Sequence, residues 1–151
     1  VITDKVIRLT KHRPDKKYFC KKELLPMLNP YLTFNGTCEE AVNFYADAFG
    51  GGKTDFARLD NNPSNPIMHA SVTFTEYEGC IMGADTDKLV AISGMAICVV
   101  LPTREAIEEI SAKLAEGGTL VQGFLPHPPP HQNDGGAEVL DKYGYTWYLS
   151  T

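Results

Sequence analysis

The sequence has 151 residues, 43% of them hydrophobic and 22% charged, which is enough to form one globular domain with an ordinary core. Residues 1–26 carry eight basic and three acidic side chains, a net charge of +5, and because the whole chain has −5, residues 27–151 carry −10. This acidic body argues against nucleic acid as a partner, since phosphate binding needs a basic surface. No apolar run approaches the ~20 residues of a membrane span, so no membrane partner is expected.

Residues 1–26 show no regular pattern, and Met27 stands directly before the first clear strand. We interpret 1–26 as a basic leader or added extension. The alternative is an arm that adds a strand or wraps a partner subunit. The segment lacks the apolar stretch of a secretory signal, so we expect a cytoplasmic protein with reduced thiols; its four cysteines show no CxxC spacing.

A strand followed directly by an amphipathic helix opens the domain. Residues 31–34 are aromatic or β-branched at most positions, which favours a strand. Thr37 and Glu40 have the spacing of a capping box at a helix start. Apolar residues then recur at the spacing of one helix face, and we predict that they enter the core: Ala41, Phe44, Tyr45, Ala48 and Phe49.

Three more strands follow, at 53–59, 67–75 and 80–84. The strand at 67–75 alternates strictly, which predicts one face toward a core and one toward a wetter space. The predicted core face holds Met68, Ala70, Val72 and Phe74. The predicted polar face holds His69, Ser71, Thr73 and Thr75.

The second half repeats this order. An apolar strand at 94–101, in which we place Cys98 in the core, leads into a helix with Thr103 as N-cap and an apolar stripe of Ile107, Ile110 and Leu114. Strands are predicted at 120–124, 136–140 and 146–150. The proline-rich residues 126–131 contain His127 and His131, but prolines forbid the helix that would make this spacing a metal pair.

The two halves are related by a shift of 66 residues, which places Thr103 on Thr37, Ile110 on Phe44 and Leu114 on Ala48. A repeat of this size indicates two units that bury their sheets together. We therefore predict an α+β fold of two βαβββ modules forming an incomplete β-barrel cleft with helices outside. Module one spans 27–87 and module two 92–151, within a single domain at 27–151.

Residues 29–51, 67–74 and 141–150 together resemble the glyoxalase/bleomycin-resistance/dioxygenase superfamily, with the vicinal oxygen chelate fold, and within it the PhnB-like branch. The resemblance covers about residues 27–151. It implies paired βαβββ modules, a homodimer, and small-molecule sites in the clefts. PhnB-like proteins are sometimes labelled methyltransferases, but the sequence has no glycine-rich cofactor loop on a βαβ unit.

The resemblance also implies where a metal would bind in this superfamily. The four ligand positions fall on Pro30 (or Asn29), His69, Met95 and Tyr148. Of these, His69 alone suits a divalent ion, whereas three ligands are the usual minimum for a catalytic site. We therefore expect no cofactor, and a divalent metal is disfavoured.

The sequence predicts a small-molecule-binding protein or metal-independent enzyme, with the ligand held beside His69 as the candidate catalytic residue. The candidate ligand-binding residues are Tyr31, Thr33, Ser71, Thr73 and Tyr148. The first alternative is a metal-dependent lyase, dioxygenase or thiol transferase of the same fold. The second is a protein that sequesters an antibiotic or metabolite without catalysis, and the third is an interaction scaffold whose cleft is filled by side chains.

Overall fold

The computed structural model describes residues 28–89 and 91–151, so the predicted leader or arm at 1–26 lies outside the described residues. Module one contains β1 (Tyr31–Phe34), α1 (Cys38–Ala48), β2 (Gly52–Arg58), the short 3-10 helix η1 (Leu59–Asn61), β3 (Ile67–Phe74) and β4 (Cys80–Asp85). Module two contains β5 (Ile97–Val100), α2 (Arg104–Leu114), β6 (Thr119–Pro126), β7 (Gly135–Leu140) and β8 (Thr146–Ser150). No helix of the described part is long and apolar enough to cross a membrane.

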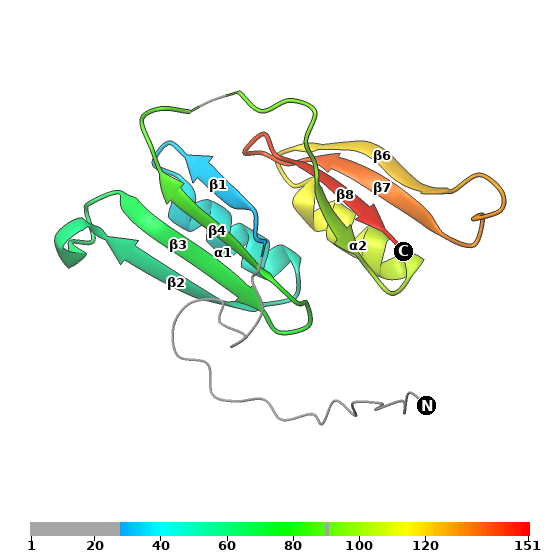
Figure 1. Cartoon of the computed structure of the whole chain (residues 1–151), viewed down its shortest axis with the longest axis horizontal. Coiled ribbons are helices and arrows are strands. Elements are labelled where there is room, and N and C mark those ends of the chain that lie inside the picture. Colours follow the sequence, from blue (N-terminus) through cyan, green and yellow to red (C-terminus); the bar gives the residue numbers. More distant parts are fainter. Residues whose placement is uncertain (1–27, 90) are drawn as a thin grey trace, which may run out of the picture.

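The two modules have the same topology (Figure 1). Each is a four-stranded sheet, in the order β1-β4-β3-β2 and β5-β8-β7-β6. The first strand of each module pairs in parallel with the last, β1 with β4 and β5 with β8. The predicted fold of two βαβββ modules is thus confirmed.

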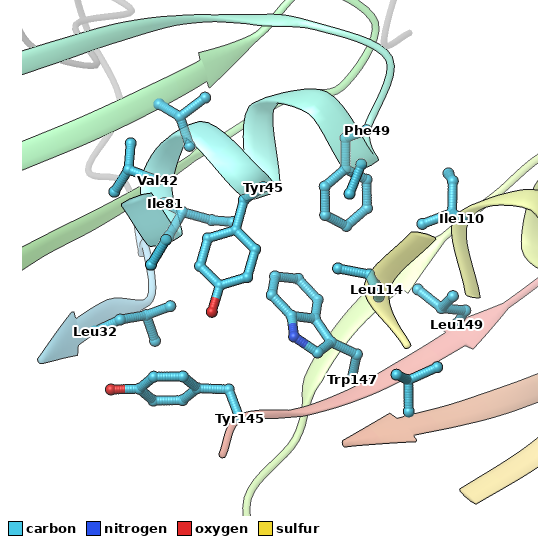
Figure 2. Packing of buried hydrophobic residues seen from close by; sticks show 14 of the residues in the cluster. Leu32, Val42, Tyr45, Phe49, Ile81, Ile110, Leu114, Tyr145, Trp147 and Leu149 are labelled. Atoms are coloured by element: carbon cyan, nitrogen blue, oxygen red, sulfur yellow. The ribbon is translucent and has the colours of Figure 1, made fainter. Parts of the chain in front are cut away.

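Each helix covers one face of its own sheet, and the two helix-covered faces share one hydrophobic core. Figure 2 shows where the modules meet: Tyr45 of α1 and Phe49, the residue that follows α1, lie against Trp147 of β8, beside Ile110 and Leu114 of α2. The Trp147 and Tyr45 side chains are fully buried, with ring centroids 5.2 Å apart. The predicted helix stripes are therefore core residues, and Phe44 packs against the edge of the core.

The sheet faces opposite the helices remain uncovered in a single copy. We call the residues on the uncovered side of β1–β4 the module-one face: Tyr31, Thr33, Lys53, Asp55, Ala57, His69, Ser71, Thr73, Met82 and Ala84. The module-two face is the corresponding side of β5, β7 and β8: Cys98, Val100, Gly136, Glu138, Leu140, Thr146, Tyr148 and Ser150. The helices lie on the other side of both sheets, as expected for a cleft-forming fold.

Two predictions of side-chain direction were wrong by one residue. In β3, Ile67 is buried and Met68 is 55% exposed, because the pairing with β2 slips between Ala57 and Arg58 and leaves Met68 as the extra residue of a bulge. Cys98 is exposed on the module-two face, since strand alternation directs its neighbours Ile97 and Val99 toward the core.

The start of α1 is capped by a residue distant in sequence. Thr37 makes no side-chain cap bond, so the predicted capping box does not form. Asp85, at the end of β4, accepts instead from the amides of Gly36 and Cys38 through Oδ1, at 2.9 and 3.0 Å, and from the amide of Ile67 through Oδ2, at 2.9 Å. A carboxylate at a helix N-terminus also complements the helix dipole. In α2, by contrast, Thr103 accepts from the Ala106 amide as predicted.

A buried carboxylate joins the two modules. Asp141 is 3% exposed and follows β7. Its Oδ2 accepts from the Tyr45 hydroxyl of α1 and from the Trp147 indole nitrogen, both at 2.8 Å. Its Oδ1 accepts from the amides of Tyr143 and Tyr145, both at 2.9 Å. Each oxygen thus receives two donors, which compensates the cost of burying the charge.

A second link lies beside it. The Tyr145 hydroxyl donates to the Thr33 carbonyl and accepts from the Thr33 amide, both at 2.8 Å. Because Thr33 belongs to the edge strand β1, a side chain of module two satisfies the outer edge of module one at this residue.

Asp141→Asn should lower the free energy of unfolding by about 3 kcal/mol, measured by urea denaturation. The asparagine side chain has one oxygen in place of two. Its NH2 group would face two of the four donors that now bond to the carboxylate, and an NH2 group cannot accept those hydrogen bonds. The exposed Asp47→Asn on α1 is the control, with an expected change within about 0.5 kcal/mol. Equal stability of the two variants would contradict the role assigned to Asp141.

Alkaline pH should test the burial of Cys38. Burial, reinforced by Asp85 and Glu39, raises the pKa of Cys38 from 9.0 to about 12. Its contribution to stability is therefore complete below pH 9 and lost as the pH rises toward 12, because the unfolded thiol ionises first. When the pH is raised from 8 to 10, the free energy of unfolding of the parent should fall by about 1 kcal/mol more than that of the Cys38→Ala variant, which has no thiol to ionise at this position. Cys98→Ala, at an exposed thiol, should follow the parent curve, and parallel curves for all three proteins would refute the prediction.

Candidate functional site

The module-one face brings five of the six predicted site residues together. Strand alternation in β3 directs His69, Ser71 and Thr73 away from the core, and all three are half-buried. Tyr31 and Thr33 extend from β1 on the same side. The rings of Tyr31 and His69 lie with centroids 6.1 Å apart and planes inclined by 35°.

The register of the strands fixes the order of groups across this face. One row runs from Tyr31 through Met82 and Ser71 to Asp55. These side chains combine an aromatic ring, a thioether, a hydroxyl and a carboxylate on one face of a sheet whose other face packs against the hydrophobic core. Such a surface can bind a small molecule with an apolar part and hydrogen-bonding groups.

Tyr148, the sixth predicted residue, lies on the module-two face. Its hydroxyl is 3.1 Å from Nε2 of His127, which follows β6. Its cross-strand neighbours are Cys98 in β5 and Glu138 in β7. A single copy therefore divides the predicted site residues between two separate sheets.

Two hollows are described, and neither is lined by His69. The larger, about 480 Å³, lies between the β3–β4 turn and β5 and includes Phe74, Tyr77 and Trp147 in its lining. The smaller, about 400 Å³, is lined by Thr33, Glu40 and Tyr143 among others. Neither of these two hollows is the cleft expected beside His69.

Three interacting side chains at the smaller hollow show clear electrostatic effects. Glu40 Oε1 accepts from Lys142 Nζ at 2.7 Å and from the Tyr143 hydroxyl at 2.8 Å. The bond from Lys142 is the main cause that lowers the pKa of Glu40. Burial and then the bond to Glu40 raise the pKa of Tyr143 to about 12, so this phenol stays protonated at neutral pH. The group is suited to holding the modules together rather than to proton transfer.

The residues at the superfamily's metal-ligand positions do not fit a divalent ion. Pro30 has no donor side chain, Met95 precedes β5 and is 55% exposed, and Tyr148 contacts His127. Across residues 28–89 and 91–151, no three His, Cys, Asp or Glu side chains gather in a way that could hold a metal ion. The donor set thus offers no catalytic metal site at these positions.

Sequence reasoning did not assign Glu138 to the module-two face or His127 to a contact with Tyr148 on that face. His127 lies in a proline-rich connector without periodicity, and its contact with Tyr148 depends on the path of that loop. Glu138 has a detectable signal, because it alternates with the apolar residues Ala137 and Val139, which are buried.

The family described as 3-demethylubiquinone-9 3-methyltransferase has a model that matches residues 26–150. The chain belongs to this family. It is a PhnB-like member of the vicinal oxygen chelate superfamily, which confirms the resemblance seen in the sequence. A comparison with curated proteins finds no match.

Solved structures agree with the PhnB-like fold. A PhnB protein from Bacillus cereus is 26% identical, with a TM-score of 0.66 over 83% of this chain and 98% of that one. Protein PA1353 from Pseudomonas aeruginosa is 24% identical, with a TM-score of 0.69 over 83% and 96%. FosX from Listeria monocytogenes, solved with Mn(II) and sulfate, is 12% identical, with a TM-score of 0.57 over 85% and 93%, and shows the fold alone.

The Tyr148 ring of this PhnB-like protein packs over Gly136, so a substitution of this glycine tests the position of the ring. A Cβ atom at Gly136 would lie 2.8 Å from the Tyr148 hydroxyl oxygen and 2.8 Å from the Leu149 carbonyl oxygen. Gly136→Ala should therefore displace the Tyr148 ring and lower the free energy of unfolding by about 1–3 kcal/mol. Gly123→Ala in β6 is the matched control, because a Cβ there meets nothing within 4 Å. Unfolding curves and the Tyr148 NMR signals measure both effects, and a Gly136 variant like the control would contradict this packing.

Proposed function

We propose that this protein binds a small molecule on the module-one face beside His69, as a binding protein or a metal-independent enzyme. The observation that carries the proposal is the group of half-buried polar side chains on β3, His69, Ser71 and Thr73, on a sheet whose other face is fully packed. Polar groups held on a rigid surface lose little entropy on binding, which favours a defined ligand orientation.

Each residue of this face has a proposed role. Tyr31 and Met82 provide apolar contact, and the hydroxyls of Ser71 and Thr73 bind polar groups of the ligand. His69 orients a polar group or moves a proton, because imidazole both donates and accepts near neutral pH.

The cleft is proposed to need a second copy of the chain. Each copy has two uncovered sheet faces, and large apolar side chains remain exposed on both, including Tyr31 at 51% and Val100 at 73%. In a twofold dimer, the module-one face of one copy opposes the module-two face of its partner, and the symmetry produces two identical clefts. Tyr148 of the partner subunit then completes the predicted set.

Methyl transfer, the reaction in the family's description, has little support from the described residues. Nucleotide-containing donors are commonly held by a glycine-rich loop between a strand and a helix. The turn from β1 to α1 has one glycine, Gly36, and the turn from β5 to α2 has none. Metal-dependent chemistry is equally disfavoured by the donor set at the superfamily's ligand positions. The cytoplasmic location stays a prediction.

His69→Ala should weaken the binding of a small molecule identified by its effect on the melting temperature. The expected loss is about tenfold in affinity, equivalent to roughly 1.4 kcal/mol for a lost hydrogen bond. Thr75→Ala, just beyond the end of β3, is the matched control and should bind like the parent. Calorimetry measures the affinities, and the ligand is recovered to see whether it was converted.

The outcomes separate the alternatives. A converted ligand indicates an enzyme, and tight binding of an intact ligand indicates sequestration. Stoichiometric Zn, Ni, Mn or Fe that is lost in His69→Ala would establish the metal-dependent alternative instead. Unchanged affinity in His69→Ala would refute the role of His69, and the absence of any ligand for a dimeric protein would favour an interaction scaffold.

A further inference from the structure

Glu138 is an acidic side chain on the module-two face with no positive partner in its own module. It is half-buried at the middle of β7, between the core residues Ala137 and Val139. Its cross-strand neighbours are Tyr148 in β8 and Gln122 in β6, and neither can neutralise a carboxylate. A charged carboxylate loses hydration when it is partly buried, and a cation bound beside it compensates this loss. Glu138 is therefore a candidate position for binding a cation.

The cations of module two bind other carboxylates. Residues 91–151 contain three Lys or Arg side chains, all of them described. Arg104 pairs with Glu108 at 2.7 Å, Lys113 with Glu109 at 3.0 Å, and Lys142 with Glu40 of module one at 2.7 Å. None of the three is paired with Glu138, and His127 of the same module contacts Tyr148.

Tyr148, the cross-strand neighbour of Glu138 on the same face, is held in a fixed position. Its ring passes closely over Gly136, where a Cβ would lie 3.0 Å from Cζ. Its hydroxyl reaches Nε2 of His127 at 3.1 Å, and the His127 amide donates to the Asp134 carbonyl at 2.8 Å, which closes the β6–β7 loop. In the tautomer whose Nε2 accepts the phenolic proton, the lone pairs of the Tyr148 oxygen remain available to accept from a ligand.

We propose that Glu138 and Tyr148, with His127 as the positioning residue, form a binding site for the protonated primary amine of a small molecule. An ammonium group has three donors and no acceptor, so it can bind acceptor side chains on neighbouring strands, such as the carboxylate of Glu138 and the phenolic oxygen of Tyr148. The ring of Tyr148 adds an aromatic surface next to the cation. The charge of −10 on residues 27–151 also attracts cations to the molecule.

This site stands on module two alone and does not depend on the role proposed for His69. In the proposed dimer, the two faces would share one cleft, and the site would then select ligands with an amine. The module-one face offers a useful comparison, because its carboxylate Asp55 has Lys53 two residues away on the same face.

The test uses n-butylammonium as the probe and the full-length protein labelled with 15N. We expect saturable NMR shift changes at residues 136–138 and 146–150, with a dissociation constant in the millimolar range, about −4 kcal/mol, as for a small fragment. The Glu138→Gln variant should bind about tenfold more weakly, equivalent to roughly 1.4 kcal/mol, because a neutral amide loses the attraction between the carboxylate and the ammonium group. Tyr148→Phe should weaken binding by a smaller factor.

Three controls make the result decisive. Asp47→Asn and Glu116→Gln each remove an exposed carboxylate that lies outside both sheet faces, and both variants should leave the affinity unchanged. Neutral n-butanol should not reproduce the shifts. Unchanged affinity in a folded Glu138→Gln variant, equal shifts with n-butanol, or shifts centred away from β7 and β8 would each overturn the proposal.

Discussion

The buried carboxylate of Asp141 is the interaction on which the arrangement of the two modules depends. It accepts hydrogen bonds from a hydroxyl of α1, from an indole of β8 and from two backbone amides of the turn between β7 and β8. Hydrophobic contact between Trp147, Tyr45 and Phe49 is strong but not directional. The four hydrogen bonds supply direction, because a carboxylate left with unsatisfied geometry in this interior would be costly. The modules are thus held in one orientation.

That orientation decides what each sheet offers to solvent. Because the helix-covered faces share a core, the module-one and module-two faces both point outward and neither closes over the other. The candidate site residues of a single chain are therefore divided between two faces of different chemistry, with His69 on one and Tyr148 on the other. Neither described hollow is lined by His69.

Most of the fold was predictable because local patterns carried it. The helix stripes, the strand alternation in β3 and the shift of 66 residues between the halves each follow from periodicity. The errors arose where an interaction with a residue distant in the sequence replaced the local interaction that the pattern predicts. Thr37 and Glu40 have the capping-box spacing, but Asp85 satisfies the helix amides and Glu40 binds Lys142. The bulge at Met68 depends on pairing with β2, which no single-strand pattern contains.

The candidate site was predictable to the same extent. His69, Ser71 and Thr73 follow from alternation, which is local, and their grouping with Tyr31 and Thr33 follows from the repeat. The separation of Tyr148 from them did not follow, because the sequence does not tell whether two modules meet through their helices or their open faces. The contact of His127 depends on the loop after β6, and proline-rich loops have no periodic signal.

The duplication is not exact at the junction between the modules. The shift that relates the halves places Ser111 at Tyr45, and aligning the turn glycines Gly144 and Gly79 places Glu76 at Asp141. Tyr45 and Asp141 are hydrogen-bonded, whereas Glu76 is exposed and the buried Ser111 hydroxyl has no partner within the described structure. The position that corresponds to the Tyr45–Asp141 pair therefore lacks a hydrogen bond of this kind. Local unfolding should therefore break contacts near Ser111 before it breaks the hydrogen bonds of Asp141. Amide hydrogens of α2 near Ser111 should then exchange with solvent before those of β8.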